Sequence, residues 1–178
     1  MRYFEESVET LPRKALETLQ IEKLCSMLEQ IYGRNRFYTD KFNAAGIHPD
    51  SIQTLDDLKR LPLTSKSELV QAQSDALPFG SNTTFKESAY SRFHQTSGTT
   101  GTPLRVLDTP ESWDWWGRCW GYVLAGAGLT ENDRLFVPFS FGPFIGFWAA
   151  VEGSQNINAM MIPGGGRDSL QRLHLMKE

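Results

Sequence analysis

A short run rich in glycine and hydroxyl residues, Thr96-Ser97-Gly98-Thr99-Thr100-Gly101-Thr102-Pro103, has the composition best suited to chemistry in this sequence. Glycine lets a backbone turn sharply and brings its N–H groups close to an anion. The hydroxyl groups of the run add donors for phosphate oxygens and can help to hold a Mg²⁺ ion. Because strand-like segments flank the run on both sides, it is suited to cradle a triphosphate.

The run is not a Walker A motif, which requires Gly-x-x-x-x-Gly-Lys-Ser/Thr at the start of a helix. Here the lysine is missing and Pro103 follows, so an ordinary P-loop NTPase is not indicated. A polar surface hairpin is the alternative for a generic run of this kind, since Gly, Ser and Thr are common turn residues.

Residues 1–87 are predicted to form a helical N-terminal region. Apolar residues recur at helical spacing after Pro12, and Gly33 suits the end of that helix. Helices are also expected over 38–45, from Thr54 to before Pro62, and from Ser65, where Ser65 and Glu68 have capping-box spacing. These helices contain no candidate catalytic or binding residues, which favours a structural layer that packs on another part of the protein.

Residues 88–178 are predicted to form an α/β region with the phosphate-binding run. Strands are expected over 89–95, 104–107, 133–139 and 157–162 and helices over 109–127, 144–152 and 167–178. The predicted fold class is therefore α/β: an N-terminal helical layer followed by an α/β sheet. Since this pattern stops inside a helix, the two regions are expected to be parts of one incomplete domain.

Composition narrows the classes of function. Hydrophobic residues make up 40% and charged residues 22%, which is typical of a globular protein. The net charge of −3, with no basic run, argues against nucleic acid as a partner. Cys25 and Cys119 have no metal-ligand spacing, and with no signal peptide we expect a cytoplasmic protein. The apolar segment 135–151 contains Pro and Gly and is shorter than the ~20 residues of a membrane span.

The string Ser-Gly-Thr-Thr-Gly-x-Pro closely resembles the signature loop of the adenylate-forming acyl-CoA synthetases. Further segments, Phe37–Ile47, Leu55–Lys66, His94–Gly98 and Pro163–Gly166, are similar to the phenylacetate-CoA ligase family. The similarity runs along nearly the whole chain but covers only the front portion of that family, less than half of a typical member. It implies part of the large N-terminal domain of an adenylate-forming enzyme.

The resemblance implies a ligase that joins a carboxylic acid, here an aryl acid, to ATP and transfers the acyl group to coenzyme A. The implied partners are the acid, ATP with Mg²⁺, and CoA, and the resemblance is compatible with a homodimer. The residues implied to hold the ATP phosphates are Thr96, Ser97, Gly98, Thr99, Thr100 and Gly101, of which Thr99 and Thr100 are the candidates to approach Mg²⁺. No catalytic residue is assigned within the chain.

The acyl pocket of the family receives residues from the loop after a strand and from a glycine-rich turn. The corresponding candidates here are Phe141, Gly142 and Pro143, together with Gly164 and Gly165. Packing in the core and a plain turn are the alternatives for these residues. His94 is interpreted as a satisfied strand histidine, and the tryptophans of 113–120 as packing residues.

Two departures from the family pattern stand beside the loop. Thr102 replaces the lysine that usually precedes the proline, and Leu104 follows it. The change removes a positive charge beside the phosphates, or passes that role to Arg105. The adenine-binding segment and the C-terminal lysine of the family are absent, so we expect no turnover by this chain alone. Four alternatives stay open: a non-catalytic nucleotide-binding module, a purely structural fragment, loading of a carrier protein, and a role in polysaccharide biosynthesis.

Overall fold

The structure is a computed structural model that describes residues 3–98 and 101–178. The chain forms two compact units. The helical unit comprises Thr10–Ser91 and Gly98–Leu107, and the sheet unit comprises Met1–Glu9, Arg92–Ser97 and Asp108–Glu178. The predicted boundary between residues 87 and 88 stays a prediction.

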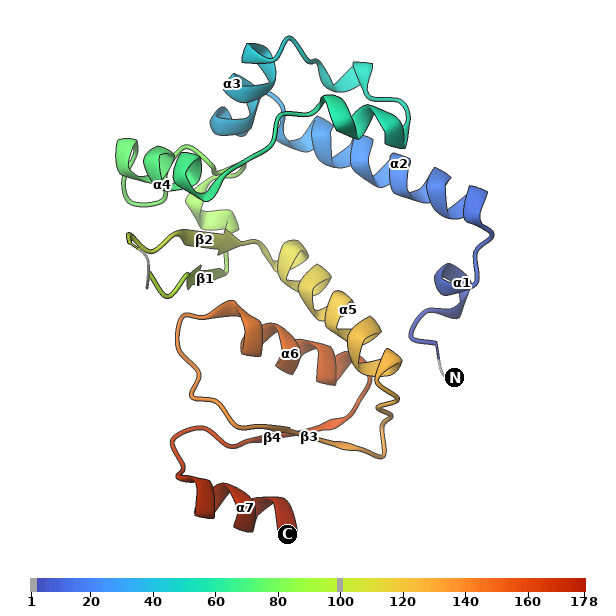
Figure 1. The fold of residues 1–178 in the computed structure, drawn as a ribbon, viewed down its shortest axis with the longest axis vertical. Coiled ribbons are helices and arrows are strands. Elements are labelled where there is room, and N and C mark those ends of the chain that lie inside the picture. The colour runs from blue at the N-terminus through green and yellow to red at the C-terminus, as the bar shows by residue number, and fades with distance from the viewer. Residues whose placement is uncertain (1–2, 99–100) are drawn as a thin grey trace. The chain divides into compact units, whose positions relative to one another are not determined.

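The helical unit is built from one long helix and several short ones that follow one another along the chain (Figure 1). They are α2 (Arg13–Ile31), α3 (Arg36–Ala44), η1 (Pro49–Ser51), η2 (Leu55–Arg60), α4 (Lys66–Asp75) and η3 (Glu87–Ala89). Strand β2 (Arg105–Asp108) begins at the end of this unit. The predicted helices are confirmed, with the segment after Thr54 forming a 3-10 helix.

A small apolar core holds the helical unit together. Leu28, Phe42, Ile47 and Ile52 are buried and in contact with one another. Asn35 caps α3 by accepting the Tyr38 N–H at 3.1 Å, and it is itself buried. The core therefore joins α2, α3 and the segments around η1.

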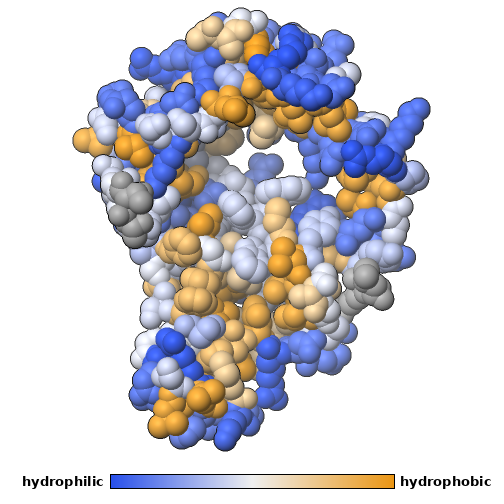
Figure 2. Space-filling view, in the orientation of Figure 1, coloured by the Kyte–Doolittle hydropathy of each residue, from blue (hydrophilic) through white to orange (hydrophobic). Residues whose placement is uncertain are grey.

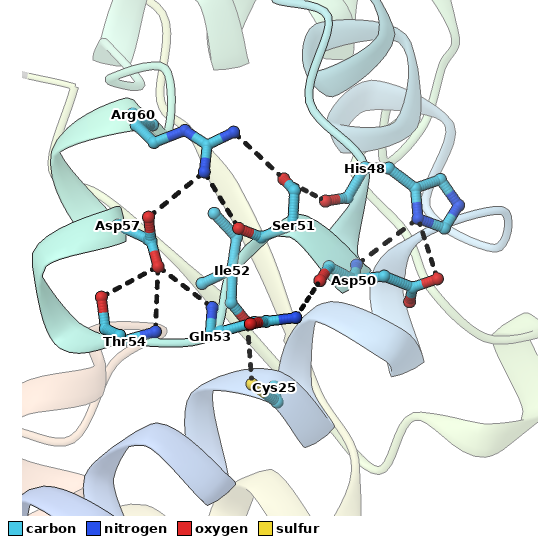
Figure 3. Close-up of polar contacts among 9 residues, drawn as sticks. All are labelled: Cys25, His48, Asp50, Ser51, Ile52, Gln53, Thr54, Asp57 and Arg60. Atoms are coloured by element: carbon cyan, nitrogen blue, oxygen red, sulfur yellow. Dashed lines mark hydrogen bonds and ion pairs between the residues drawn. The ribbon is translucent and has the colours of Figure 1, made fainter.

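Polar contacts fix the segment between η1 and η2 against α2 (Figure 3). The Cys25 thiol donates to the carbonyl of Ile52 at 3.3 Å. The Arg60 guanidinium donates to the Ser51 carbonyl at 2.9 Å and to the Asp57 carboxylate at 3.2 Å. The free thiol of Cys25 thus has a packing and hydrogen-bonding role.

The sheet unit contains a parallel strand pair and the helices that accompany it (Figure 1). Its elements are α1 (Glu6–Glu9), β1 (Arg92–Gln95), α5 (Pro110–Gly126), β3 (Arg134–Val137), α6 (Ile145–Asn156), β4 (Met160–Pro163) and α7 (Ser169–Lys177). Strand β3 pairs with β4 in parallel, and the register places Val137 opposite Pro163.

Helices α5 and α6 pack closely against each other because small residues lie at their contact. A Cβ atom added to Gly153 would lie 2.3 Å from the Cβ of Trp120, and one added to Gly117 would lie 2.6 Å from Cγ of Glu152. Apolar residues also gather on the exposed face over α6 and the segment before it (Figure 2), where Phe144 and Trp148 are half exposed.

The starts of two strands differ most from the prediction. The expected strand 89–95 begins only at Arg92, since η3 precedes it and the Tyr90 hydroxyl accepts hydrogen bonds from the N–H groups of Thr84 and Phe85 at 2.9 and 3.0 Å. The expected strand 157–162 begins at Met160 because α6 continues to Asn156 and Asn158 has a left-handed φ of 56°. The α/β alternation itself is confirmed.

Candidate functional site

The predicted phosphate loop makes a tight turn that requires glycine. Gly98 has a φ of 68° and Gly101 a φ of 145°, conformations that L side chains rarely adopt. The Gly101 N–H donates to the Gly98 carbonyl at 3.0 Å. A Cβ on Gly98 would lie 2.7 Å from Cγ of Pro103, so the proline ring packs directly on this glycine. Gly98 and Gly101 therefore adopt backbone conformations that favour glycine, and their predicted role in phosphate binding stays a prediction.

Thr99 and Thr100, which stand between the two glycines in the sequence, lie outside the described residues. Their predicted contacts with phosphate and Mg²⁺ stay predictions, as do those of Thr96 and Ser97. Arg105, a candidate to supply the missing positive charge, donates from its guanidinium to the Pro78 carbonyl at 2.7 Å. That contact engages one end of the guanidinium with backbone of its own unit.

The two predicted acyl-pocket segments meet at the carboxyl ends of β3 and β4. The Gly164 N–H donates to the Val137 carbonyl at 2.7 Å, and the Gly166 N–H donates to the Ser140 hydroxyl at 3.2 Å. A Cβ on Gly165 would lie 2.3 Å from the Phe139 carbonyl oxygen. The glycine-rich turn and the loop after β3 are therefore in direct contact, at the edge where open α/β sheets bind ligands.

The loop after β3 also contacts the strand that leads into the phosphate loop. The Gln95 N–H, at the end of β1, donates to the Pro143 carbonyl at 2.8 Å. Trp148 on α6 donates from Nε1 to the Gly142 carbonyl at 2.8 Å, and its ring lies 4.7 Å from that of Phe141, measured between centroids. These contacts place Phe141, Gly142 and Pro143 beside the residues that enter the phosphate loop.

Cavities of about 360 and 530 Å³ lie within the sheet unit. The larger of these two adjoins the loop after β3. It is lined by Arg92, Phe93, His94, Trp113, Gly142, Trp148, Val151, Glu152 and Gln155. Small-molecule sites are usually ~300–1,000 Å³ and combine aromatic walls with a few polar groups. The larger cavity has both properties.

Polar contacts within the cavity wall hold its aromatic side chains in place. His94 is buried, its Nδ1 lies 3.3 Å from Oδ2 of Asp108, and its ring stacks on Trp113 with centroids 5.1 Å apart. Trp113 donates from Nε1 to Oε2 of Glu152 at 2.9 Å. The Arg92 guanidinium lies over the same indole at 5.4 Å from the ring centroid. The packing interpretation of His94 and Trp113 is compatible with these contacts, although both residues also line the cavity.

Sequence patterns do not predict that Glu152 and Gln155 line the larger cavity. The available signal was a lone carboxylate, Glu152, within the apolar stretch of α6. A charge on a buried helix face needs a partner, and that partner is the indole of Trp113, which lies far away in the sequence.

Residues 3–98 and 101–178 contain neither a cluster of metal ligands nor a membrane-spanning helix. No group of three or more His, Cys, Asp or Glu side chains there is arranged to hold a metal ion. None of the helices described has the length and apolar character needed to cross a bilayer.

Comparisons of sequence find related enzymes along nearly the whole chain. Phenylacetate-coenzyme A ligase of Escherichia coli (strain K12) is 32% identical over 171 residues, which are 96% of this chain and 38% of the relative. The Thermus thermophilus enzyme of the same name is 30% identical over 98% of this chain and 38% of its own length. This chain therefore spans little more than a third of the curated relatives that it matches. No protein-family model matches the chain.

Comparisons of structure find the same kind of protein. An open conformation of 2-hydroxyisobutyryl-CoA ligase, in complex with 2-HIB-AMP and CoA, superposes with a TM-score of 0.88 at 24% identity, over 99% of this chain and 42% of that chain. The same enzyme in its thioesterification state gives 0.85 at 26% identity, over 94% and 37%. The resemblance and the fold class predicted from the sequence are both confirmed.

Proposed function

We propose that this chain, a relative of the phenylacetate-coenzyme A ligases, supplies the phosphate- and acid-binding part of an acid–CoA ligase. In that reaction a carboxylate oxygen attacks the α-phosphorus of ATP, which gives an acyl-adenylate and releases pyrophosphate. The CoA thiol then attacks the acyl carbon, which forms the thioester and releases AMP. The relatives' names and the adenylate and CoA in the similar structures support this reaction.

One observation carries the proposal: two segments far apart in the sequence meet beside the strand that enters the phosphate loop. The loop Phe139–Pro143 contacts the Gly164–Gly166 turn, and Pro143 accepts the hydrogen bond from Gln95. An acid bound at this edge would lie near the start of the phosphate loop. Adenylation requires that proximity, because its rate depends on holding the two reactants in attacking geometry.

Within the proposed site, Thr96 to Gly101 hold the β- and γ-phosphates of ATP, and Thr99 or Thr100 approaches Mg²⁺. The left-handed Gly98 and Gly101 fit this role because they let the backbone fold tightly beneath an anion. Mg²⁺ would neutralise charge on the phosphates that leave as pyrophosphate. Charge stabilisation and positioning suffice here, and no protein nucleophile is required.

The acid is proposed to be an aryl acid that enters the larger cavity. Trp113, Trp148 and Phe93 supply aromatic walls, and the Phe141 ring contacts Trp148 at a tilt of 52°. Gly142, Pro143, Gly164 and Gly165 are proposed to shape the loop edge, where a side chain at Gly164 would meet the Phe136 ring and one at Gly165 the Phe139 carbonyl.

The nucleotide part of the proposal is tested by calorimetric titration of the chain with ATP and Mg²⁺. We expect saturable binding that is lost in Gly98→Ala, since the new Cβ meets Pro103 and the backbone is left-handed. Gly33→Ala is the matched control, because Gly33 is also left-handed, with φ of 77°, but has open space around it. Absence of binding by the unaltered chain, or unchanged binding by Gly98→Ala, would overturn the phosphate-loop assignment.

The acid part is tested by titrating phenylacetate and 2-hydroxyisobutyrate in parallel. Aromatic walls predict tighter binding of phenylacetate, and Trp148→Ala should weaken it. Tighter binding of the small hydroxy acid would replace the aryl assignment with an aliphatic one.

A non-catalytic nucleotide-binding module is the second candidate, and the absent lysine at Thr102 favours it. It predicts ATP binding without acid-dependent release of pyrophosphate from any complete protein that contains this chain. Thr102→Lys should raise ATP affinity if the missing charge limits binding.

A further inference from the structure

The backbone that leaves the phosphate loop is held by one buried side chain of α4. Gln73 is 4% exposed and lies 30 residues before Pro103 in the sequence. Its carboxamide Nε2 donates to the Pro103 carbonyl at 3.1 Å, and its Oε1 accepts the Arg105 N–H at 2.7 Å. Both polar ends of one amide are therefore used on two backbone groups directly after the loop.

The position of Gln73 is itself tightly confined. The chain after α4 folds back so that a Cβ on Gly80 would lie 2.8 Å from the Cα of Gln73. The Gly80 N–H donates to the Ala76 carbonyl at 2.6 Å, and Gly80 has a φ of 84°. Close backbone contact on this side leaves the Gln73 side chain little freedom to follow a displaced loop.

The contact continues from Gln73 to the glycine of the turn. Pro103, whose carbonyl Gln73 binds, packs its ring on Gly98, where a Cβ would lie 2.7 Å from Cγ of the ring. The Gly98 carbonyl in turn accepts the Gly101 N–H at 3.0 Å. A continuous set of contacts therefore runs from α4 through Pro103 to the closure of the loop, all within the helical unit.

We propose that Gln73 is a positioning residue for nucleotide binding. It fixes the backbone at Pro103 and Arg105, and through the contact of Pro103 with Gly98 it confines the first glycine of the phosphate loop. The inference rests on the proposed function of the loop. Gln73 touches no phosphate in this assignment and acts only through the backbone. A buried amide is suited to the task because its donor and acceptor are satisfied together.

The test compares MgATP dissociation constants of the full chain with those of two variants. Gln73→Met keeps the side-chain length but loses both hydrogen bonds, so MgATP binding should weaken at least tenfold. Gln71→Met is the matched control on the same helix, where Gln71 is exposed and bonds to Asp75 at 2.7 Å. The control should bind within twofold of the unaltered chain.

Gln73→Glu supplies a readout that a merely structural role would not move. A protonated carboxyl can donate to the Pro103 carbonyl and accept from the Arg105 N–H, whereas a carboxylate repels that carbonyl. Affinity for MgATP relative to the unaltered chain should therefore approach unity at low pH and fall as the pH rises. The comparison uses one folded variant at several pH values, so it decides the matter even where Gln73→Met does not fold.

The outcomes separate the two proposals. If the unaltered chain does not bind MgATP, the proposed function of the loop fails. If it binds, and the Gln73 variants bind equally well at every pH, the positioning role of Gln73 is overturned while the function stands.

Discussion

The contacts that stabilise the helical unit internally differ from those that stabilise the sheet unit internally. In the helical unit, residues close in sequence cap the helices: Ser65 and Glu68 form a capping box on α4, and Thr54 and Asp57 form one on η2. In the sheet unit α5 and α7 are also capped locally, but in addition glycines let helices approach each other, as Gly153 does against Trp120. Helix starts are therefore fixed by residues close in sequence, whereas the packing of α5 on α6 depends on residues that meet only after folding.

The N-terminal segment of the sheet unit shows the same dependence on distant partners. The Phe4 ring covers Gly121, where a Cβ would lie 2.5 Å from Cζ of the phenylalanine. Glu5 accepts hydrogen bonds from Arg118 and from the Tyr122 hydroxyl, the latter at 2.8 Å. These contacts join residues more than a hundred positions apart in the sequence, so local sequence patterns do not predict them.

The largest effect is expected from a cavity in the helical core. Leu28→Ala should lower the free energy of unfolding by about 2–5 kcal/mol, because Leu28 is 1% exposed and the space it leaves cannot fully collapse. Urea unfolding measures the change. Met27→Ala is the control, since Met27 is 50% exposed on the same helix and should cost far less. Equal costs would mean that the buried cluster does not stabilise this unit.

The next effect is expected where the sheet unit is packed too tightly for a side chain. Gly153→Ala should destabilise by about 1–3 kcal/mol through overpacking against Trp120. Gly126→Ala, at the end of α5, has nothing within 4 Å of the added Cβ and should be neutral or stabilising by up to about 1 kcal/mol. Thermal unfolding of both variants tests the contrast, and a stabilising Gly153→Ala would contradict it.

A smaller effect is expected at a helix cap. Ser65→Ala removes the hydroxyl that accepts the Glu68 N–H at 3.3 Å, which should cost about 1 kcal/mol. Ser74→Ala on the same helix removes only a hydroxyl bonded to the Val70 carbonyl and is the control. Hydrogen exchange in α4 should rise in the first variant only, and exchange that rises equally in both would remove the capping argument.

The smallest effect is expected in the acid range. Hydrogen bonds from the Gln53 N–H, then from Thr54 and Arg60, lower the pKa of the Asp57 carboxyl from its ordinary value of 3.8 to about 2. A lowered native pKa contributes stability in full above the ordinary value, and that stability is lost as the pH falls through about 2. Carboxyl NMR titration should detect the low pKa directly.

Asp57→Asn should remove this part of the acid dependence, whereas Asp56→Asn, which leaves the contacts of Gln53 and Thr54 intact, should retain it. The carboxyl is only partly buried, so screening by solvent keeps the effect on stability small. An Asp57 carboxyl that titrates at its ordinary value would show that the η2 capping box is not formed in solution.

Sequence patterns predict the helices of the first region, the α/β alternation after it and the family resemblance. The capping pair of Ser65 and Glu68 is predicted correctly because its hydrogen bonds span only three residues. The ends of strands are predicted less accurately. Strand β1 is shorter than predicted because the hydroxyl of Tyr90 accepts hydrogen bonds from the backbone N–H groups of Thr84 and Phe85.

The residues that surround the candidate site come together through tertiary contacts, which sequence patterns do not predict. The contact of the Gly164–Gly166 turn with Phe139, the pairing of Trp113 with Glu152 and the hold of Gln73 on Pro103 join residues 25 or more positions apart. Sequence patterns report the local preference of a backbone for helix, strand or turn. Which buried amide meets which carbonyl depends on how the chain closes on itself, and most buried polar groups find such a partner.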